Sequence, residues 1–249
     1  MAAYAPSMAA LPGPEEYAAH SDDHHHRDIS GGALLAATFG AMDGLVTNIA
    51  LVAGVGGGGA DRHVIVLTGM AGLVAGAFSM ALGEFASVRT QNEAVAGEVA
   101  IERAELARHP NAEQAELVEM YRDLGLSQAT AEAVAREVHA DPELALRAHV
   151  REELGVSVDD QPSPWTAAVS SFLCFAVGAV VPLLPFLAGS SSLLWSLLVG
   201  EVGLFAVGAV TSRFTAKPWW YAGGRQLVFG AIAAGATFVV GSLIGVSAA

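Results

Sequence analysis

Residues 64–88 read VIVLTGMAGLVAGAFSMALGEFASV, a stretch of 25 residues in which Glu84 is the only charged side chain. A helix that crosses a bilayer needs about 20 predominantly apolar residues, so this stretch predicts a membrane span. Four other stretches meet the same requirement, at about residues 32–55, 165–187, 193–210 and 223–246. The sequence therefore predicts an all-α integral membrane protein with five transmembrane helices.

The charged residues are distributed unevenly. Hydrophobic residues make up 53% of the chain and charged residues only 15%, against about 25% charged in a typical soluble domain. Of the 25 acidic residues, 16 lie between Glu93 and Asp160. Residues 91–162 are thus predicted to form a soluble acidic insert, with spans at 30–90 and 163–249 and a mobile polar tail at 1–29.

The insert has a helical pattern, rich in Ala, Glu, Leu and Arg with apolar spacing near 3.6. Its sequence is interrupted at Pro110, at residues 125–127 and at Asp141-Pro142. We therefore expect three or four short helices in the insert.

Charge and composition limit the possible partners and activities. A net charge of -13 opposes nucleic-acid binding and favours cations. The single Cys174 provides neither a disulfide nor a thiolate metal site, and no phosphate-binding Gly-x-x-x-x-Gly-Lys precedes the only lysine, Lys217. The spans contain no histidine and no visible nucleophile–base pair. We expect no prosthetic group, no ATP-driven pumping and no enzymatic activity.

Lys and Arg placement predicts the orientation. With the tail in the cytoplasm, eleven of the twelve basic residues fall on the cytoplasmic side and only Arg62 lies outside. The N-terminus and the insert are therefore expected in the cytoplasm and the C-terminus outside. No apolar segment with a basic flank opens the sequence, so we expect no cleaved signal peptide and a bacterial plasma membrane as the location.

Three side chains in the first two spans are candidates for a cation path. A carboxylate at the depth of Asp43 costs about 2.5–3.5 kcal/mol unless it faces water, a partner or an ion. Glu84 is the acid of the second span, and Met80 lies one turn before it on the same face; a thioether suits a late first-row metal. The alternatives are a hydrogen bond from Asp43 to a neighbour such as Thr47, a solvated helix end at Glu84, and plain packing at Met80.

In the insert, acidic side chains recur at helical spacing, as in Glu98, Glu102 and Glu105, in Glu113, Glu116 and Glu119, and in the His149 and Glu153 pair. Clustered like charges destabilise a helix unless a cation lies among them. Carboxylates with one imidazole suit iron(II), manganese(II) or zinc(II). The alternative is a solvated acidic face partnered by Arg103, Arg108 and Arg147. The Glu-x-x-His pairs of di-iron oxidases are missing, which argues against ferroxidase chemistry.

Three further features of the sequence each allow two interpretations. Gly40 with Gly44, Gly72 with Gly76 and Gly241 with Gly245 indicate close helix packing, either within one bundle or along a homodimer seam that involves the first span. The run His24-His25-His26 beside Asp22 and Asp23 is either a loose metal-collecting segment or a solvated tail. Glu201, alone in the fourth span, is a candidate for the ion path or for proton relay.

Two segments resemble a known family. Asp43-Gly44-Leu45-Val46 with LVAGV at 51–55, and GLVAGAFSMALGEF at 72–85, are similar to the most specific segments of the vacuolar iron transporter family. The resemblance covers residues 28–247 and includes the acidic insert and the Pro182 and Pro185 pair.

The resemblance implies a dimer of five-helix subunits, a cytoplasmic metal-binding domain on an extended second helix, and export of iron(II) or manganese(II) in exchange for protons. It places Asp43 and Met80 on the translocation path. The insert ligands it implies are Glu102, Glu105, Glu113, Glu116 and Glu153, with His149 where plant-type members carry methionine. A second departure is Gly72, where plant-type members carry a carboxylate; here the acid of the second span is Glu84.

The functional hypothesis is a divalent transition-metal transporter that exports iron(II), or manganese(II), from the cytoplasm by proton antiport. A carboxylate cannot hold a proton and a divalent ion together, so one group can couple the two fluxes. The metal ligands predicted are Glu102, Glu105, Glu113, Glu116, His149 and Glu153, and the path residues are Asp43, Met80 and Glu84. The alternative is a membrane-anchored metal-binding or metal-sensing protein without transport.

Overall fold

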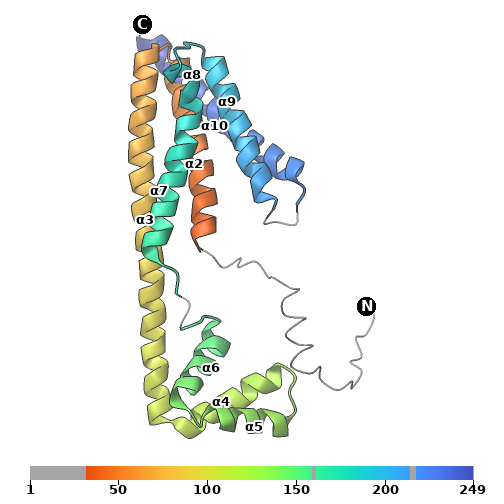
Figure 1. Cartoon of the computed structure of the whole chain (residues 1–249). Coiled ribbons are helices and arrows are strands. Elements are labelled where there is room, and N and C mark those ends of the chain that lie inside the picture. The colour runs from red at the N-terminus through yellow and green to blue at the C-terminus, as the bar shows by residue number, and fades with distance from the viewer. Residues whose placement is uncertain (1–31, 159–160, 214–216, 249) are drawn as a thin grey trace. The chain divides into compact units, whose positions relative to one another are not determined.

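The computed structural model describes residues 32–158, 161–213 and 217–248, and the predicted tail with its histidine run lies outside the described residues. The described residues form helices and no strand, and five of their helical segments are long and apolar enough to cross a membrane. The predicted all-α membrane fold is thereby confirmed (Figure 1).

The membrane segments are α2 (Gly32–Gly57), α3 (Arg62–Arg108), α7 (Pro164–Val180) with η1 (Val181–Leu183) and α8 (Leu184–Leu187), α9 (Leu193–Thr211) and α10 (Trp219–Ala248). The third span changes to a 3₁₀ turn at Pro182, because proline lacks the N–H that a continuous α-helix would use. The insert adds α4 (Pro110–Asp123), α5 (Gln128–Val138) and α6 (Pro142–Leu154), with breaks at the three positions predicted.

Helix α3 connects the bundle to the insert without interruption. It has 47 residues, which at 1.5 Å per residue is about 70 Å, more than twice the roughly 30 Å of hydrocarbon in a bilayer. Its second half contains no proline and is rich in Ala, Glu and Arg, which are strong helix formers. The part of α3 beyond about residue 88 therefore lies outside the membrane core and carries the insert.

Glycines allow α2 to pack closely on its neighbours. A Cβ on Gly40 or Gly44 would meet the backbone of Ser171 and Phe175 in α7, and a Cβ on Gly241 would meet the backbone of Gly54. These glycine pairs are thus used for helix packing within the chain.

Asn48 joins three spans at the centre of the bundle. Its side chain is fully buried, and Nδ2 donates to the carbonyl oxygens of Gly69 in α3 (3.2 Å) and Ala179 in α7 (2.6 Å). A buried amide that made no such bonds would cost free energy, so these two bonds fix α2 against α3 and α7.

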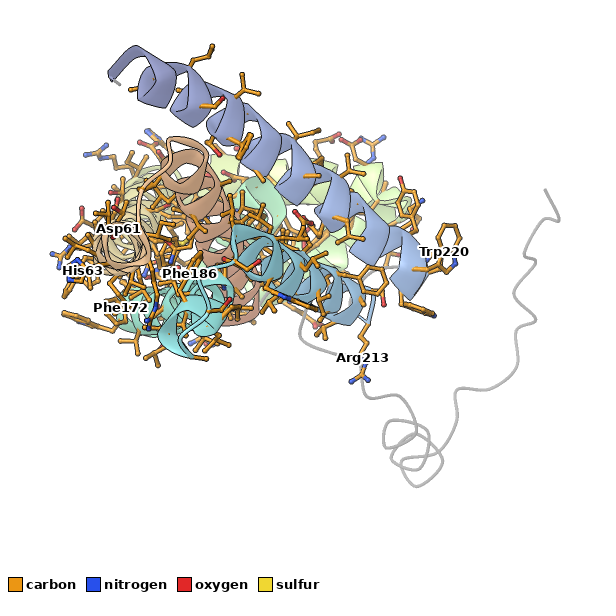
Figure 2. All side chains as sticks on the ribbon, turned by 90° about the horizontal axis from the view of Figure 1, so that it is seen from above. Asp61, His63, Phe172, Phe186, Arg213 and Trp220 are labelled. Carbon is orange, nitrogen blue, oxygen red and sulfur yellow. The ribbon has the colours of Figure 1, made fainter. Side chains whose placement is uncertain are left out.

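The outer surface of the bundle is apolar. Leu67, Leu82 and Val177 are more than 60% exposed, and Trp219 and Trp220 at the start of α10 are also exposed. Figure 2 shows Trp220 pointing away from the bundle. Exposed aliphatic side chains on long helices, with tryptophans near a helix end, are typical of a lipid-facing surface.

The insert helices pack through two small apolar clusters. Leu117 and Val118 of α4 meet Ala131 and Ala135 of α5. Separately, Val99 of α3 packs against two apolar residues of α6, Leu146 and Val150. These clusters determine which polar side chains of the insert come together.

Candidate metal site and membrane path

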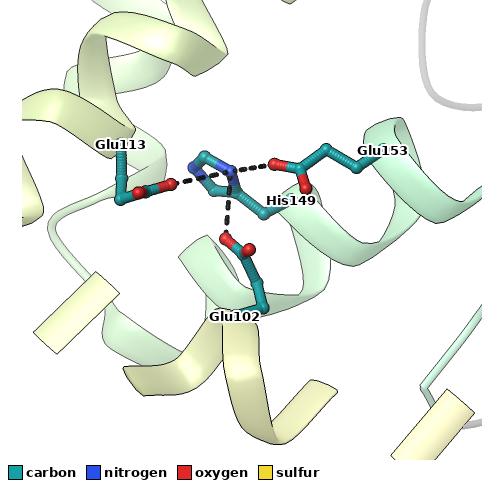
Figure 3. Close-up of side chains that lie close together, drawn as sticks. All are labelled: Glu102, Glu113, His149 and Glu153. Atoms are coloured by element: carbon teal, nitrogen blue, oxygen red, sulfur yellow. Dashed lines mark hydrogen bonds and ion pairs between the residues drawn. The ribbon is translucent and has the colours of Figure 1, made fainter. Parts of the chain in front are cut away.

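Four side chains from three helices converge in the insert. Glu102 comes from α3, Glu113 from α4, and His149 and Glu153 from α6 (Figure 3). Each offers one nitrogen or oxygen atom, and these four atoms lie within 4.8 Å of one another. We call these four residues the insert cluster.

The packing of α6 against α3 brings His149 and Glu153 next to Glu102. Leu146 and Val150 press α6 against α3, and His149 lies between them in sequence. His149 and Glu153 are four residues apart and so occupy the same face of α6. This arrangement places both side chains beside Glu102.

Glu113 reaches the cluster because the chain reverses at the end of α3. Helix α3 ends at Arg108, and α4 begins at Pro110 with Glu113 in its first turn. The unpaired N–H groups of a helix start favour a carboxylate there. Glu113 is 9% exposed and is therefore buried despite its charge.

His149 is the centre of the cluster. Its Nδ1 lies 3.1 Å from Oε1 of Glu153, 3.3 Å from Oε1 of Glu102 and 3.8 Å from Oε2 of Glu113. A neutral imidazole has one N–H, so Nδ1 can donate to one of these oxygens at most. The Oε1 of Glu102 is buried, and none of the described residues forms a hydrogen bond with it.

The cluster has the chemistry of a cation site. Burial and the charge of Glu116 raise the pKa of Glu113, with His149 opposing the change. Three carboxylates around one imidazole repel one another, and a divalent ion would relieve that repulsion while satisfying the buried oxygen of Glu102. Oxygen and imidazole ligands of this kind fit iron(II), manganese(II) or zinc(II).

Two predicted ligands lie beside the cluster. Glu105 is within 3.4 Å of Arg108 and 3.8 Å of His109, and Glu116 is an exposed residue of α4. Both are close enough to raise the pKa of Glu113 by repulsion. The structure thus brings four of the six predicted ligands together, and a ligand role for Glu105 and Glu116 stays a prediction.

His139 is a neighbour that the sequence did not single out. It caps the end of α5, and its Nε2 lies 3.1 Å from Nε2 of His149. Burial, together with the charge of His149, lowers the pKa of His139. The two histidines are ten positions apart in the sequence and the break at Asp141 falls between them, so helical spacing could not relate them. The position of His139 next to that break is the one feature of the sequence that could have pointed to a role for this residue.

Asp43 lies on an open face of α2. Its side chain is exposed, with Thr47 Oγ1 at 3.5 Å from its Oδ1. One turn further along the same face begins a groove of about 850 Å³ between α2 and α10, lined by Thr47, Ala50 and Gly54 on one side and by Thr237 and Gly241 on the other. The hydrogen bond to Thr47, one of the alternatives for Asp43, is therefore present but long.

Met80 and Glu84 lie on α3, the helix that follows α2. Met80 is half-buried and packs against the cluster of Leu73, Ala77 and Phe175, and Glu84 is half-buried. Neither residue lines the groove beside α2. A shared path for Asp43, Met80 and Glu84 stays a prediction.

Glu201 is half-buried in α9 and faces α10. A Cβ on Gly230 would meet its carboxylate oxygens, and its Oε2 is buried without a hydrogen bond from any described residue. The role suggested for Glu201 from the sequence remains a prediction.

Comparison with known proteins identifies relatives over most of the chain. The model of the VIT family matches residues 34–242. Vacuolar iron transporter 1 of Oryza sativa subsp. japonica is 29% identical over 234 residues, which cover 92% of this chain and 93% of the relative. Vacuolar iron transporter 1 of Arabidopsis thaliana is 26% identical over 230 residues, covering 90% and 91% of the two chains. The vacuolar iron transporter of Acanthamoeba castellanii is 34% identical over 165 residues, covering 66% and 59%.

Proposed function

This chain belongs to the VIT family, and we propose that it carries iron(II), with manganese(II) as a second cargo, out of the cytoplasm in exchange for protons. Members of this family are transporters and not enzymes, and similar proteins are named vacuolar iron transporters. The observation that carries the proposal is the insert cluster, three carboxylates grouped around the buried imidazole of His149. One of these carboxylates, that of Glu102, lies on α3, the helix that continues into the membrane-spanning bundle.

The insert would collect the ion before it enters the membrane. Glu102, Glu113, His149 and Glu153 offer three oxygens and one nitrogen, and Glu105 and Glu116 add negative charge beside them. Because the insert carries most of the acidic residues, it raises the local concentration of divalent cations. The ion is the cargo here, so the site needs moderate affinity and must release it.

The path would then follow Glu84, Met80 and Asp43. The exposed position of Asp43 on a spanning helix supports a role in the path, because a carboxylate facing lipid is costly. A second copy of the chain that covers this face of α2 would enclose Asp43 and the adjoining groove. We therefore propose a homodimer in which the ion and the returning proton use the Asp43 carboxylate in turn.

Orientation and location complete the proposal. Placing the insert in the cytoplasm puts eleven of the twelve basic residues on that side. With this orientation the insert takes metal from the cytoplasm, and the direction of transport is export. A bacterial plasma membrane is the proposed location.

Flux in proteoliposomes tests the proposal. Purified protein is reconstituted with a metal-sensitive dye or a pH-sensitive dye inside, and anaerobic iron(II) is added outside. The wild type should move iron(II) and protons in opposite directions, and Asp43→Asn should reduce both fluxes at least about tenfold. Glu132→Gln is the matched control, because it makes the same acid-to-amide change at an exposed residue of α5.

The two functional hypotheses give different results in this assay. Undiminished flux in Asp43→Asn would refute its role in the path. Metal binding by the wild type without any flux would favour the membrane-anchored metal-binding or metal-sensing protein. Metal flux without proton movement would refute antiport and leave metal transport standing.

A further inference from the structure

Both ring nitrogens of His149 have a neighbour within hydrogen-bond distance. The side chain is fully buried. Its Nδ1 faces the carboxylates of the insert cluster, 3.1 Å from Glu153. Its Nε2 lies 3.1 Å from Nε2 of His139, with the two rings nearly perpendicular at 72°. The buried ring is therefore held between the acidic cluster on one edge and a second imidazole on the other.

A metal ion can bind Nδ1 of His149 in one tautomer only. Metal ions take a nitrogen lone pair, so Nδ1 must be without its proton and Nε2 must carry it. A buried N–H without an acceptor is unfavourable, because it loses its hydrogen bond to water and gains none in the protein. Among the described residues, His139 Nε2 is the atom placed to accept from His149 Nε2.

We propose that His139 is a positioning residue that accepts a hydrogen bond from Nε2–H of His149 and so directs the Nδ1 lone pair of His149 at the metal ion. The inference rests on the proposed metal binding by the insert cluster. Metal-ligating histidines almost always donate their second N–H to an acceptor, which fixes the tautomer and the ring orientation. Here the acceptor is an imidazole rather than a carboxylate or a backbone carbonyl.

The fold holds His139 firmly enough for this role. Helix α5 packs on α4 through Ala131 and Ala135, which are fully buried. At its end, the backbone N–H of His139 bonds to the carbonyl of Ala135 at 3.0 Å. The ring of His139 thus approaches His149 from a helix other than the three that supply the cluster. This makes α5 part of the site although it contributes no ligand.

Two substitutions of His139 separate an acceptor from a space-filling residue. His139→Gln keeps an oxygen that can accept a hydrogen bond near the position of Nε2, whereas His139→Leu removes every acceptor. Mn²⁺ is the probe, because its free concentration and its nitrogen couplings can both be measured by electron paramagnetic resonance. The full-length protein in lipid nanodiscs is titrated, and His149→Ala defines how much of the binding belongs to the cluster.

We expect the wild type to bind Mn²⁺ with coupling to one nitrogen that is lost in His149→Ala. His139→Leu should weaken this binding about 10–100-fold and weaken or remove the nitrogen coupling, and His139→Gln should restore both to within a few fold of the wild type. Far-ultraviolet circular dichroism of each variant checks that the helices are intact.

Other results overturn the inference in distinguishable ways. Unchanged affinity and nitrogen coupling in His139→Leu would show that His149 needs no such acceptor. Equal weakening in both variants would assign His139 a role in packing. Coupling to two nitrogens, one of them lost in His139→Leu, would make His139 a ligand itself. Absence of Mn²⁺ binding above the level of His149→Ala in the wild type would overturn the proposed cluster function together with this inference.

Discussion

At the residue scale, burial favours the protonated form of Glu113, whereas metal binding requires its ionised form. It is buried in the first turn of α4, and the raised pKa reflects burial first and the charge of Glu116 second. In the metal-free protein its ionised form is therefore less favourable in the folded state than in the unfolded state. A divalent ion would reverse this balance, because it needs the ionised carboxylate as a ligand.

The sign of the pH dependence follows from the raised pKa. Protonation of Glu113 is easier in the folded metal-free protein, so this residue makes the free energy of unfolding increase as the pH falls through its raised pKa towards the ordinary carboxyl value. Glu113→Gln should remove that dependence and raise the midpoint of thermal unfolding at about pH 7. Thermal unfolding of the chelator-treated protein at neutral and mildly acidic pH measures both effects.

The same variant should lose metal. Glu113→Gln should weaken Mn²⁺ binding by at least about tenfold, and the affinity of the wild type should fall as the pH is lowered because protons compete for the carboxylates. Glu132→Gln on α5 is the control, with an exposed carboxylate outside the cluster. A variant that is neither more stable without metal nor weaker in binding would contradict the assignment of Glu113.

At the scale of the helices, two glycines in different surroundings test how the bundle is packed. A Cβ at Gly178 in α7 would overlap the carbonyl oxygen of Ala41 in α2, while a Cβ at Gly97 in α3 would meet nothing within 4 Å. Gly178→Ala should therefore destabilise by about 1–3 kcal/mol through overpacking. Gly97→Ala should stabilise by about 0.5–1 kcal/mol, because alanine is the better helix former.

The midpoint of thermal unfolding of the purified protein compares these two substitutions directly. Each adds one methyl group to a helix, so the chemical change is the same in both. Equal shifts in the two variants would contradict the close contact of α2 with α7 at Gly178.

The helices were predictable where a local property determines them. The length of the apolar stretches predicted the membrane spans, and Pro110 and Pro142 predicted two of the breaks between the helices of the insert. The apolar pattern could not reveal that α3 continues to Arg108, since hydropathy ends the span near residue 88 while helix propensity continues beyond it. The resemblance to a family with an extended second helix did imply this feature.

The candidate site was predictable in its residue types and only partly in its geometry. Spacing put Glu102 with Glu105, and Glu113 with Glu116, on shared helix faces. The turn between α3 and α4 decides that Glu102 and Glu113 approach His149 while Glu105 lies beside Arg108 and His109. Contacts between helices far apart in sequence, such as that of Asn48 with Ala179, leave no periodic pattern.

At the scale of the whole chain, the direction of transport depends on which side of the membrane holds the insert. The connections at residues 58–61 and 188–192 lie at the opposite ends of their helices from the insert. Charge placement predicts that the insert lies in the cytoplasm and that these two connections lie outside. The same metal site would therefore serve export in one orientation of the protein in the membrane and import in the other.

Labelling of single cysteines in intact bacterial cells measures this orientation. In a Cys174→Ala background, which removes the only native cysteine, Ser191→Cys should react with a membrane-impermeant maleimide added outside. Glu132→Cys should react only after the cells are permeabilised. Both positions are exposed in the structure, so a difference in labelling reports the side of the membrane and not burial. Labelling of Glu132→Cys in intact cells, with Ser191→Cys protected, would place the insert outside, and the proposed direction would then have to be import.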